Sequence, residues 1–247
     1  MILLAGLAAL ASSACGGNGE GTSNSSLMVF AASSLTEVLP ELGKAFAEET
    51  GNLDLSYSFG SSSDLAAQVL EGAPVDVFMS ADESNMNRVV DGGEAHSDPM
   101  VFATNTFSII LGSGNPLGIR SLEDLADPDL LVVVCAESSP CGKGAAEIIR
   151  KAKVAITPRS YEENVKSVVA KVVSGEADAG IVFATDILSA RDESDGVPIP
   201  DALNVATKYS AVVTRESDNQ DLAAAFIDFV AGDRGQSILA EFGFLRP

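Results

Sequence analysis

The chain has 247 residues, of which 46% are hydrophobic, so it can bury one large core or two smaller ones and is not a disordered protein. Its 35 acidic residues outnumber the 15 basic ones and give a formal net charge of −20. This charge repels nucleic acid and anionic lipid surfaces, so we expect no nucleic-acid partner, and a bound anion has to be held by local dipoles.

The first 14 residues form an apolar run that ends in small residues and is shorter than the roughly 20 residues that span a bilayer. The run predicts a signal peptide over residues 1–14. Cys15 follows, and a Gly/Ser/Asn-rich tether continues to residue 26. This arrangement resembles the bacterial lipoprotein signal, which predicts a lipidated Cys15 and a protein exported to the cell envelope, held at the outer face of the cytoplasmic membrane by a lipid anchor only. The alternative is an ordinary signal peptide followed by an unmodified cysteine.

Beyond the tether, strand-like apolar runs alternate with helix-like segments, which is the pattern of an α/β fold with a parallel sheet. Strands are predicted at residues 27–31, 53–59, 75–79, 107–111, 130–135, 180–183 and 209–214. Helices are predicted at residues 35–49, 64–70, 85–91, 121–126, 142–153, 165–174, 221–231 and 235–241.

At this length we expect two lobes that are joined by extended crossings near residues 103–106 and 205–209. Lobe I then comprises residues 27–105 plus 208–247, and lobe II comprises residues 106–207. Ligands of open α/β sheets bind beyond the carboxyl ends of the strands, so the expected binding site is a cleft between the lobes.

Two of the predicted strand-to-helix junctions carry serines. Residues 31–37 read AASSLTE and place Ser34 at the expected N-cap with Glu37 three residues later, which is the spacing of a capping box. Residues 59–65 read FGSSSDL, with Ser62 in the middle of a serine triplet. A helix start leaves amide hydrogens unpaired and carries the positive end of the helix dipole, so these turns are suited to hold an anion. The simpler interpretation is that the serines only cap helices and that Asp64 is a first-turn acid.

The two cysteines beyond the tether are Cys135 and Cys141. Export would place them in an oxidising compartment, so we expect a disulfide between them, with two free thiols as the alternative. A metal-ion site is not expected, because the only histidine is His96 and two cysteines alone make a poor ligand set.

Three segments resemble the periplasmic molybdate-binding proteins of ABC transporters: FAASSL at 30–35, SFGSSS at 58–63 and GAPVDVFMSAD at 72–82. The similarity continues through NVK at 164–166, GEADAGIVFATD at 175–186 and EFGF at 241–244, in an order and spacing that cover the chain after the tether. The resemblance implies a two-lobed periplasmic binding protein fold of type II and a non-enzymatic protein. It also implies molybdate or tungstate as the ligand, no cofactor, and delivery to an ABC permease and its ATPase. We expect a monomer.

The resemblance also implies a set of anion contacts: Ser34, Ser62, Cys141, Val165 and Phe183. The two serines supply hydroxyls and amides from lobe I, and the next two positions supply backbone amides from lobe II. At the fifth position the family has a tyrosine hydroxyl where this chain has Phe183, so one donor is missing there. A neighbouring hydroxyl such as that of Thr185 is a candidate replacement.

Three other interpretations compete. The same architecture could bind sulfate, phosphate or another oxyanion, because fold and serine turns are shared among anion-binding proteins. An exported serine hydrolase needs a base, and His96 lies in a polar turn with no nucleophile elbow nearby. A purely structural or adhesive surface lipoprotein is disfavoured by the two-lobe pattern.

Overall fold

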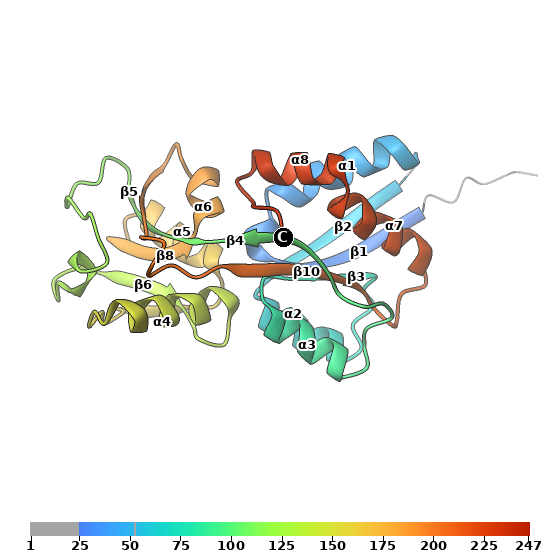
Figure 1. Cartoon of the computed structure of the whole chain (residues 1–247), viewed down its shortest axis with the longest axis horizontal. Helices are drawn as coiled ribbons and strands as arrows, with labels where there is room; N and C mark the ends of the chain where they lie inside the picture. Colours follow the sequence, from blue (N-terminus) through green and yellow to red (C-terminus); the bar gives the residue numbers. More distant parts are fainter. Residues whose placement is uncertain (1–24, 52) are drawn as a thin grey trace, which may run out of the picture.

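The structure is a computed structural model that describes residues 25–51 and 53–247 (Figure 1). The predicted signal peptide, Cys15 and most of the predicted tether lie outside the described residues. The last two tether residues, Ser25 and Ser26, already belong to the first strand. In the described part of the chain, no helix has the length and apolar character needed to cross a membrane.

Lobe I is built on a five-stranded sheet with the order β2-β1-β3-β10-β4. Its strands are β1 (Ser25–Ala32), β2 (Leu53–Gly60), β3 (Val77–Ser80), β4 (Met100–Asn105) and β10 (Thr207–Val213). β1 is parallel to β2 and β3, whereas β10 is antiparallel to β3 and β4. The sequence pattern predicted a parallel sheet, whereas the sheet is mixed, with parallel and antiparallel pairs. Helical crossovers keep the first strands parallel, but β10 enters this sheet directly from the other lobe and so runs the opposite way.

Helices cover both faces of this sheet (Figure 1). They are η1 (Ser33–Leu35), α1 (Val38–Thr50), α2 (Ser62–Leu70), α3 (Glu83–Asp91), α7 (Gln220–Ala231) and α8 (Asp233–Glu241). Successive side chains of a strand point to opposite faces, so Val29 and Phe30 belong to different hydrophobic clusters. The cluster of Val29 includes Phe46 of α1 and Phe226 of α7, and that of Phe30 includes Leu65 of α2. Because both faces are covered, the central strand β3 is buried throughout, whereas the edge strand β2 alternates apolar and polar residues.

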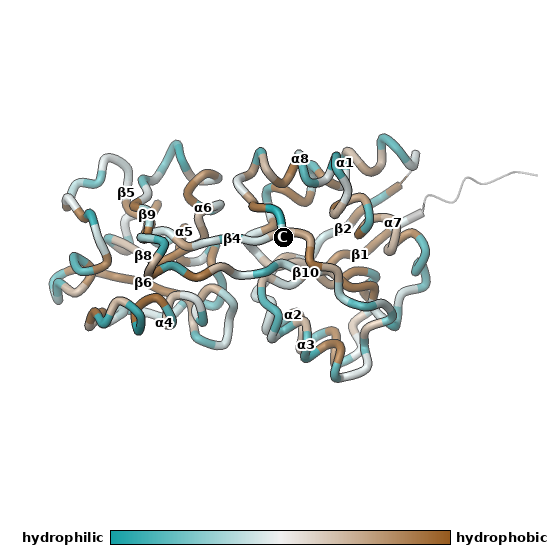
Figure 2. The backbone as a smooth tube through the Cα atoms, in the orientation of Figure 1, coloured by the Kyte–Doolittle hydropathy of each residue, from teal (hydrophilic) through white to brown (hydrophobic). Residues whose placement is uncertain are grey.

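Lobe II holds a second five-stranded sheet with the order β7-β6-β8-β5-β9. Its elements are β5 (Phe107–Gly112), η2 (Asp124–Ala126), β6 (Val132–Cys135), α4 (Pro140–Ala152), β7 (Ser160–Glu162), α5 (Val165–Val173), β8 (Ala179–Phe183), α6 (Ala184–Ser189) and β9 (Ser194–Pro198). β6 is parallel to β7 and β8, and β5, which enters from lobe I, is antiparallel to β8 and β9. Figure 2 shows hydrophobic residues concentrated along the strands and hydrophilic ones in the connecting loops.

The α/β, two-lobed fold expected from the sequence is confirmed, but four elements were missed. They are β4, β7, β9 and α6. β7 has only three residues and α6 only six, so neither shows a period, and the SDGVP sequence of β9 contains the strand-weakening residues Gly and Pro. The three strands form by pairing with neighbouring strands, and α6 forms by packing on the sheet.

Two chain segments connect the lobes, and both are visible between them in Figure 1. β4 continues into β5 across Thr106, and the segment 199–206 leads from β9 into β10. The side chain of Asn204 holds the two crossings together, because its Oδ1 accepts the Phe107 amide at 3.0 Å and its Nδ2 donates to the Phe107 carbonyl at 2.9 Å. The strand ends of the two lobes are thereby kept facing each other.

Candidate functional site

The candidate site lies where strands of both lobes end. In lobe I, Ala32 pairs with Gly60 in the parallel register of β1 and β2, so the two serine turns leave the sheet side by side. In lobe II, Cys135 of β6 pairs with Glu162 of β7, so the turns that start α4 and α5 are neighbours too.

A cavity of about 10 Å³ lies between these turns. It is lined by Ala32, Ser33, Ser34, Gly60, Ser61, Ser62, Ala81, Ser139, Pro140, Cys141, Asn164, Val165 and Phe183. All five residues that the resemblance singled out are therefore brought together at one place, from five different strand ends.

Ser34 lies in the single 3₁₀ turn η1 and does not cap a helix. The N-cap residue of η1 is Ala32, and α1 begins only at Val38 with Glu37 as its N-cap and no side-chain cap hydrogen bond. The capping box expected at Ser34 and Glu37 is therefore wrong. The Ser34 hydroxyl lies instead 2.8 Å from the hydroxyl of Tyr209 and lines the cavity.

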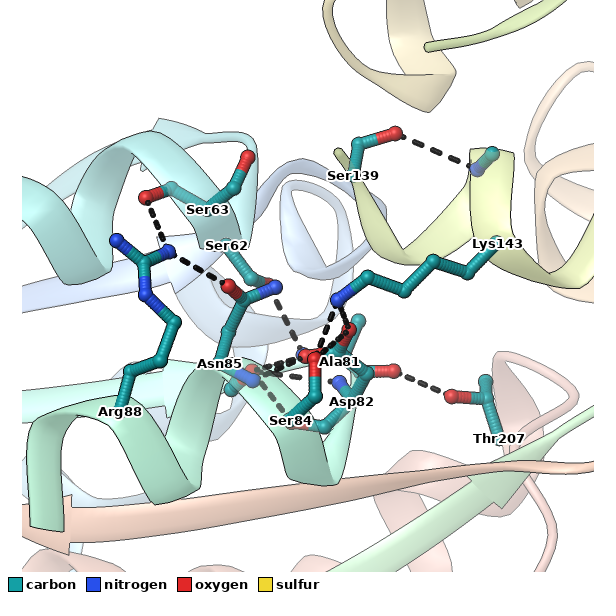
Figure 3. Close-up of polar contacts among 12 residues, drawn as sticks. Ser62, Ser63, Ala81, Asp82, Ser84, Asn85, Arg88, Ser139, Lys143 and Thr207 are labelled. Atoms are coloured by element: carbon teal, nitrogen blue, oxygen red, sulfur yellow. Dashed lines mark hydrogen bonds and ion pairs between the residues drawn. The ribbon is translucent and has the colours of Figure 1, made fainter. Parts of the chain in front are cut away.

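Ser62 is the first residue of α2, two residues earlier than the predicted start of this helix. Its side chain is 1% exposed, and its Oγ accepts the backbone N–H of Ala81 at 3.0 Å (Figure 3). The Ala81 turn follows β3, the neighbour of β1, so three adjacent strand ends build this side of the cavity. Because the Ala81 amide takes up an acceptor position of Ser62, the Ser62 O–H is left to donate into the cavity.

Two helix starts of lobe II present backbone amides to the same cavity. α4 begins at Pro140, which has no N–H, so Cys141 carries the first free amide of that helix. Its N-cap Ser139 accepts the Gly142 amide at 3.3 Å. A disulfide joins Cys141 to Cys135 at the end of β6, with a Cα–Cα distance of 5.7 Å, and ties this helix start to its strand.

The second helix start is that of α5, at Val165. The N-cap residue Asn164 accepts the Ser167 amide through its side chain at 3.2 Å. Capping of the third position leaves the Val165 amide, the first of the helix, without an intrahelical partner. Asn164 and Val165 both line the cavity.

Phe183 closes the cavity with an apolar ring. The ring is 2% exposed and its centroid lies 4.7 Å from that of Phe107 and 6.0 Å from that of Tyr209. Thr185 accepts a hydrogen bond from Asn105 at 2.9 Å and is not among the residues that line the cavity. Sequence reasoning missed Tyr209, because nothing in the local pattern of an apolar strand shows that its hydroxyl reaches Ser34.

Lysines next to the site are paired with carboxylates. Lys143 in the first turn of α4 reaches across to Asp82 of lobe I at 2.7 Å, as Figure 3 shows. Lys166 in the first turn of α5 lies 2.8 Å from Glu37 of lobe I and 2.9 Å from Asp186. Burial lowers the pKa of Lys166, but the attraction of Asp186 and Glu37 outweighs it and raises that pKa. The pKa of Asp186 is raised by its complete burial, against the opposing effect of Lys166. The groups that line the cavity are themselves uncharged.

The structure places His96, the candidate base considered from the sequence, away from the cavity. His96 is exposed, and its backbone amide donates to Val213 at the far end of β10 from Tyr209. Within residues 25–51 and 53–247, no three or more His, Cys, Asp or Glu side chains are grouped so that they could hold a metal ion. The cavity therefore offers hydroxyl and amide donors, which suit the oxygen atoms of an anion.

Comparison with known proteins gives consistent matches. The sequence model of the family described as bacterial extracellular solute-binding protein matches residues 27–245. Molybdate-binding protein ModA of Mycobacterium tuberculosis (strain H37Rv) is 37% identical over 253 aligned residues, which cover 100% of this chain and 95% of that protein.

Solved structures of other binding proteins are similar to this chain in fold. The periplasmic molybdate-binding protein of Azotobacter vinelandii matches with a TM-score of 0.80 at 22% identity, covering 90% of this chain and 99% of the other. The sulfate-binding protein SubI of Mycobacterium tuberculosis matches with a TM-score of 0.81 at 19% identity, covering 89% and 86%. At these identities the two structures support the fold alone.

Proposed function

The chain belongs to the family of bacterial extracellular solute-binding proteins, and from this premise we propose that it captures molybdate, and tungstate equally, and delivers the anion to an ABC permease and its ATPase. Its 37% identity over the full chain to a protein named for molybdate binding supports this ligand. The fold alone does not choose among oxyanions, because a sulfate-binding protein shares it.

The observation that carries the proposal is the convergence of neutral donors on one cavity. We assign the hydroxyls and amides of Ser34 and Ser62 in lobe I, and the amides of Cys141 and Val165 in lobe II, as contacts of the anion. A dianion that is taken out of water needs many hydrogen bonds, and neutral donors do not change protonation across physiological pH. The helix starts of α2, α4 and α5 add the positive ends of their dipoles.

The chain's net charge of −20 makes these local dipoles necessary, because the overall field opposes an anion. The cavity of about 10 Å³ is no larger than one water needs, so its walls have to widen to admit a tetrahedral oxyanion. Cavity size is also the property that separates molybdate and tungstate from sulfate, since the three have the same charge and shape. The two crossings at Thr106 and 199–206 are the segments about which the lobes would move.

Phe183 leaves the site without the hydroxyl that the family resemblance places there. A hydrogen bond to a charged group is worth about 1.5–3 kcal/mol, so we expect weaker binding than in a site with the tyrosine. Thr185 does not compensate in this structure, because it is not among the residues that line the cavity.

We further propose that the protein is not an enzyme. The serine hydrolase alternative requires a base next to Ser34 or Ser62, and the only histidine, His96, is exposed and does not line the cavity. The absence of a base at the site favours binding without chemistry.

The location of the protein in the cell, its oligomeric state and its lobe boundaries complete the proposed function. We propose export, a lipid anchor on Cys15 at the outer face of the cytoplasmic membrane, and a monomer. We propose lobe boundaries at residues 27–105 plus 208–247 and 106–207, which the membership of the strands in two sheets supports. Mass spectrometry of the protein from membranes tests the anchor by the mass of its N-terminal peptide.

Calorimetric titration of the anion-free protein tests the function. We expect molybdate and tungstate to bind with affinities within about threefold of each other, and sulfate at least about a hundredfold more weakly, a difference of about 2.7 kcal/mol. Sulfate binding as strong as molybdate binding would contradict the assignment. Hydrolysis of chromogenic esters that disappears in Ser34→Ala would instead support the hydrolase alternative.

A further inference from the structure

A row of hydrogen-bonded side chains leads from the segment between the lobes to the cavity. Asn105 is the last residue of β4, Tyr209 lies in β10 beside it, and Ser34 lines the cavity. The Tyr209 hydroxyl lies 2.8 Å from Ser34 Oγ and accepts from Asn105 Nδ2 at 3.5 Å. The three residues are buried, with exposed fractions of 0% for Tyr209, 1% for Asn105 and 4% for Ser34.

The direction of the first hydrogen bond is set by the orientation of the Asn105 amide. Its Oδ1 accepts the backbone N–H of Thr106 at 2.9 Å, so the oxygen faces away from Tyr209. Its Nδ2 then faces Thr185 Oγ1 at 2.9 Å and the Tyr209 hydroxyl. An amide NH₂ group has no acceptor capacity, so Tyr209 cannot donate to Asn105.

The direction of the second hydrogen bond follows from the first. Burial raises the pKa of the Tyr209 hydroxyl well above its ordinary value, so this group stays protonated. Among the described residues, Ser34 Oγ is the acceptor that the structure places within hydrogen-bond distance of it. A buried hydroxyl hydrogen without an acceptor is costly, so Tyr209 donates to Ser34. The hydrogen of Ser34 is then left to point into the cavity.

The hydroxyls of Ser34 and Ser62 are thus oriented in the same way, each by a hydrogen bond that its oxygen accepts. Ser62 Oγ accepts the Ala81 amide, and Ser34 Oγ accepts the Tyr209 hydroxyl, so each serine has a hydrogen to give and an acceptor position already used. The other assigned contacts, Cys141 and Val165, are backbone amides and can only donate. The four assigned contacts are therefore donors whose orientation is fixed before an anion arrives.

We propose that Tyr209 is a positioning and specificity residue: by donating to Ser34 it fixes the Ser34 hydroxyl as a donor, and the site thereby favours fully deprotonated oxyanions over protonated ones such as hydrogen phosphate. This inference rests on the proposed function. A protonated oxyanion carries an O–H that needs an acceptor, and burying it unpaired weakens binding. Without the Tyr209 hydroxyl, Ser34 can turn and accept from such a ligand.

The test is Tyr209→Phe, which removes only the hydroxyl, with Tyr57→Phe as the matched control. The Tyr57 hydroxyl donates to the Leu39 carbonyl at 3.1 Å and Tyr57 does not line the cavity. Each protein is titrated at neutral pH with molybdate and with inorganic phosphate at millimolar concentration. We expect Tyr209→Phe to bind molybdate about five- to tenfold more weakly and phosphate detectably and more tightly than the wild type, so that the ratio of the two affinities falls at least about tenfold. Tyr57→Phe keeps both wild-type values within about twofold.

Several results would overturn the inference. They are an unchanged molybdate affinity, a loss of both affinities by the same factor, or phosphate binding that stays undetectable in Tyr209→Phe. If the wild type itself does not bind molybdate, the proposed function fails first and the inference with it. Thermal unfolding without anion checks that each variant folds. Should Tyr209→Phe not fold, Asn105→Asp serves in its place. Its carboxylate accepts the hydrogen of Tyr209, so Ser34 no longer receives that hydrogen bond and the ratio of molybdate to phosphate affinity falls. An effect of the added charge alone weakens the binding of both anions by the same factor.

Discussion

Replacing Ser62 by alanine removes a hydroxyl with two functions. Its Oγ accepts the Ala81 amide at 3.0 Å, and its hydrogen is available to the cavity. Because Ser62 is 1% exposed, water cannot easily replace either hydrogen bond. The substitution therefore acts on anion affinity and, separately, on the stability of the anion-free protein.

The two effects have different expected sizes. Loss of one hydrogen bond to a charged ligand costs about 1.5–3 kcal/mol of binding free energy, which corresponds to a roughly 10- to 150-fold weaker molybdate affinity. The Ala81 amide, left without its acceptor, lowers the free energy of unfolding by about 1–3 kcal/mol. Isothermal titration gives the first value, and urea unfolding monitored by circular dichroism gives the second.

Ser63→Ala is the matched control in the same serine triplet. Ser63 is half-buried, its hydroxyl pairs with Ser61 at 2.7 Å, and it does not line the cavity. We expect its molybdate affinity to stay within about twofold of the wild type. If Ser62→Ala unfolds like the wild type and binds molybdate within twofold of it, Ser62 does not contact the anion and the assignment of the serine turns is refuted.

Three further predictions concern the rest of the site and the fold. Phe183→Tyr is expected to raise molybdate affinity by about tenfold or more, because it adds a donor where the ring faces the cavity; a large loss in titration would show that the cavity requires the Phe ring. Cys135→Ala combined with Cys141→Ala is expected to lower the free energy of unfolding by about 2 kcal/mol, the value for a loop this short, and to weaken molybdate binding because the amide at position 141 is less well fixed; unchanged unfolding and binding would contradict this. Burial raises the pKa of Glu162, but the hydrogen bonds from Lys171 and Ser160 together with the charge of Lys171 outweigh burial and lower that pKa below the ordinary value of 4.5. Its stabilising contribution is therefore complete above pH 4.5 and is lost as pH falls below it. Between about pH 5 and pH 3, Glu162→Gln should therefore lose less stability than the wild type in urea unfolding, and equal losses would refute the pairing.

Long apolar runs with turn residues on both sides were readable from the sequence. The predicted strands at 27–31, 53–59 and 130–135 correspond to β1, β2 and β6, and the predicted helix at 165–174 corresponds to α5. Their period and their flanking residues are local properties, so no knowledge of the fold is needed to see them. Short elements such as β7 and α6 lack that local signal and were not predicted.

The serine turns illustrate where local reasoning stops. The spacing of Ser34 and Glu37 fits a capping box, yet the turn is 3₁₀ and Ser34 pairs with a residue 175 positions away. A local pattern cannot distinguish a serine that caps its own helix from one that turns toward another strand. The contact with Tyr209 decides between the two.

The sequence by itself determined an α/β chain with serine turns at two consecutive strand ends, and its resemblance to a family picked out five positions that prove to line one cavity. The tertiary structure alone decided which groups face that cavity as donors and which are already paired. It showed that β5 and β10 run antiparallel to their neighbours because they cross between the lobes, and that this crossing places Asn105 and Tyr209 behind Ser34. The physical reason is that periodicity and capping depend on neighbours in the chain, whereas the direction of a buried hydrogen bond depends on atoms that the fold brings together.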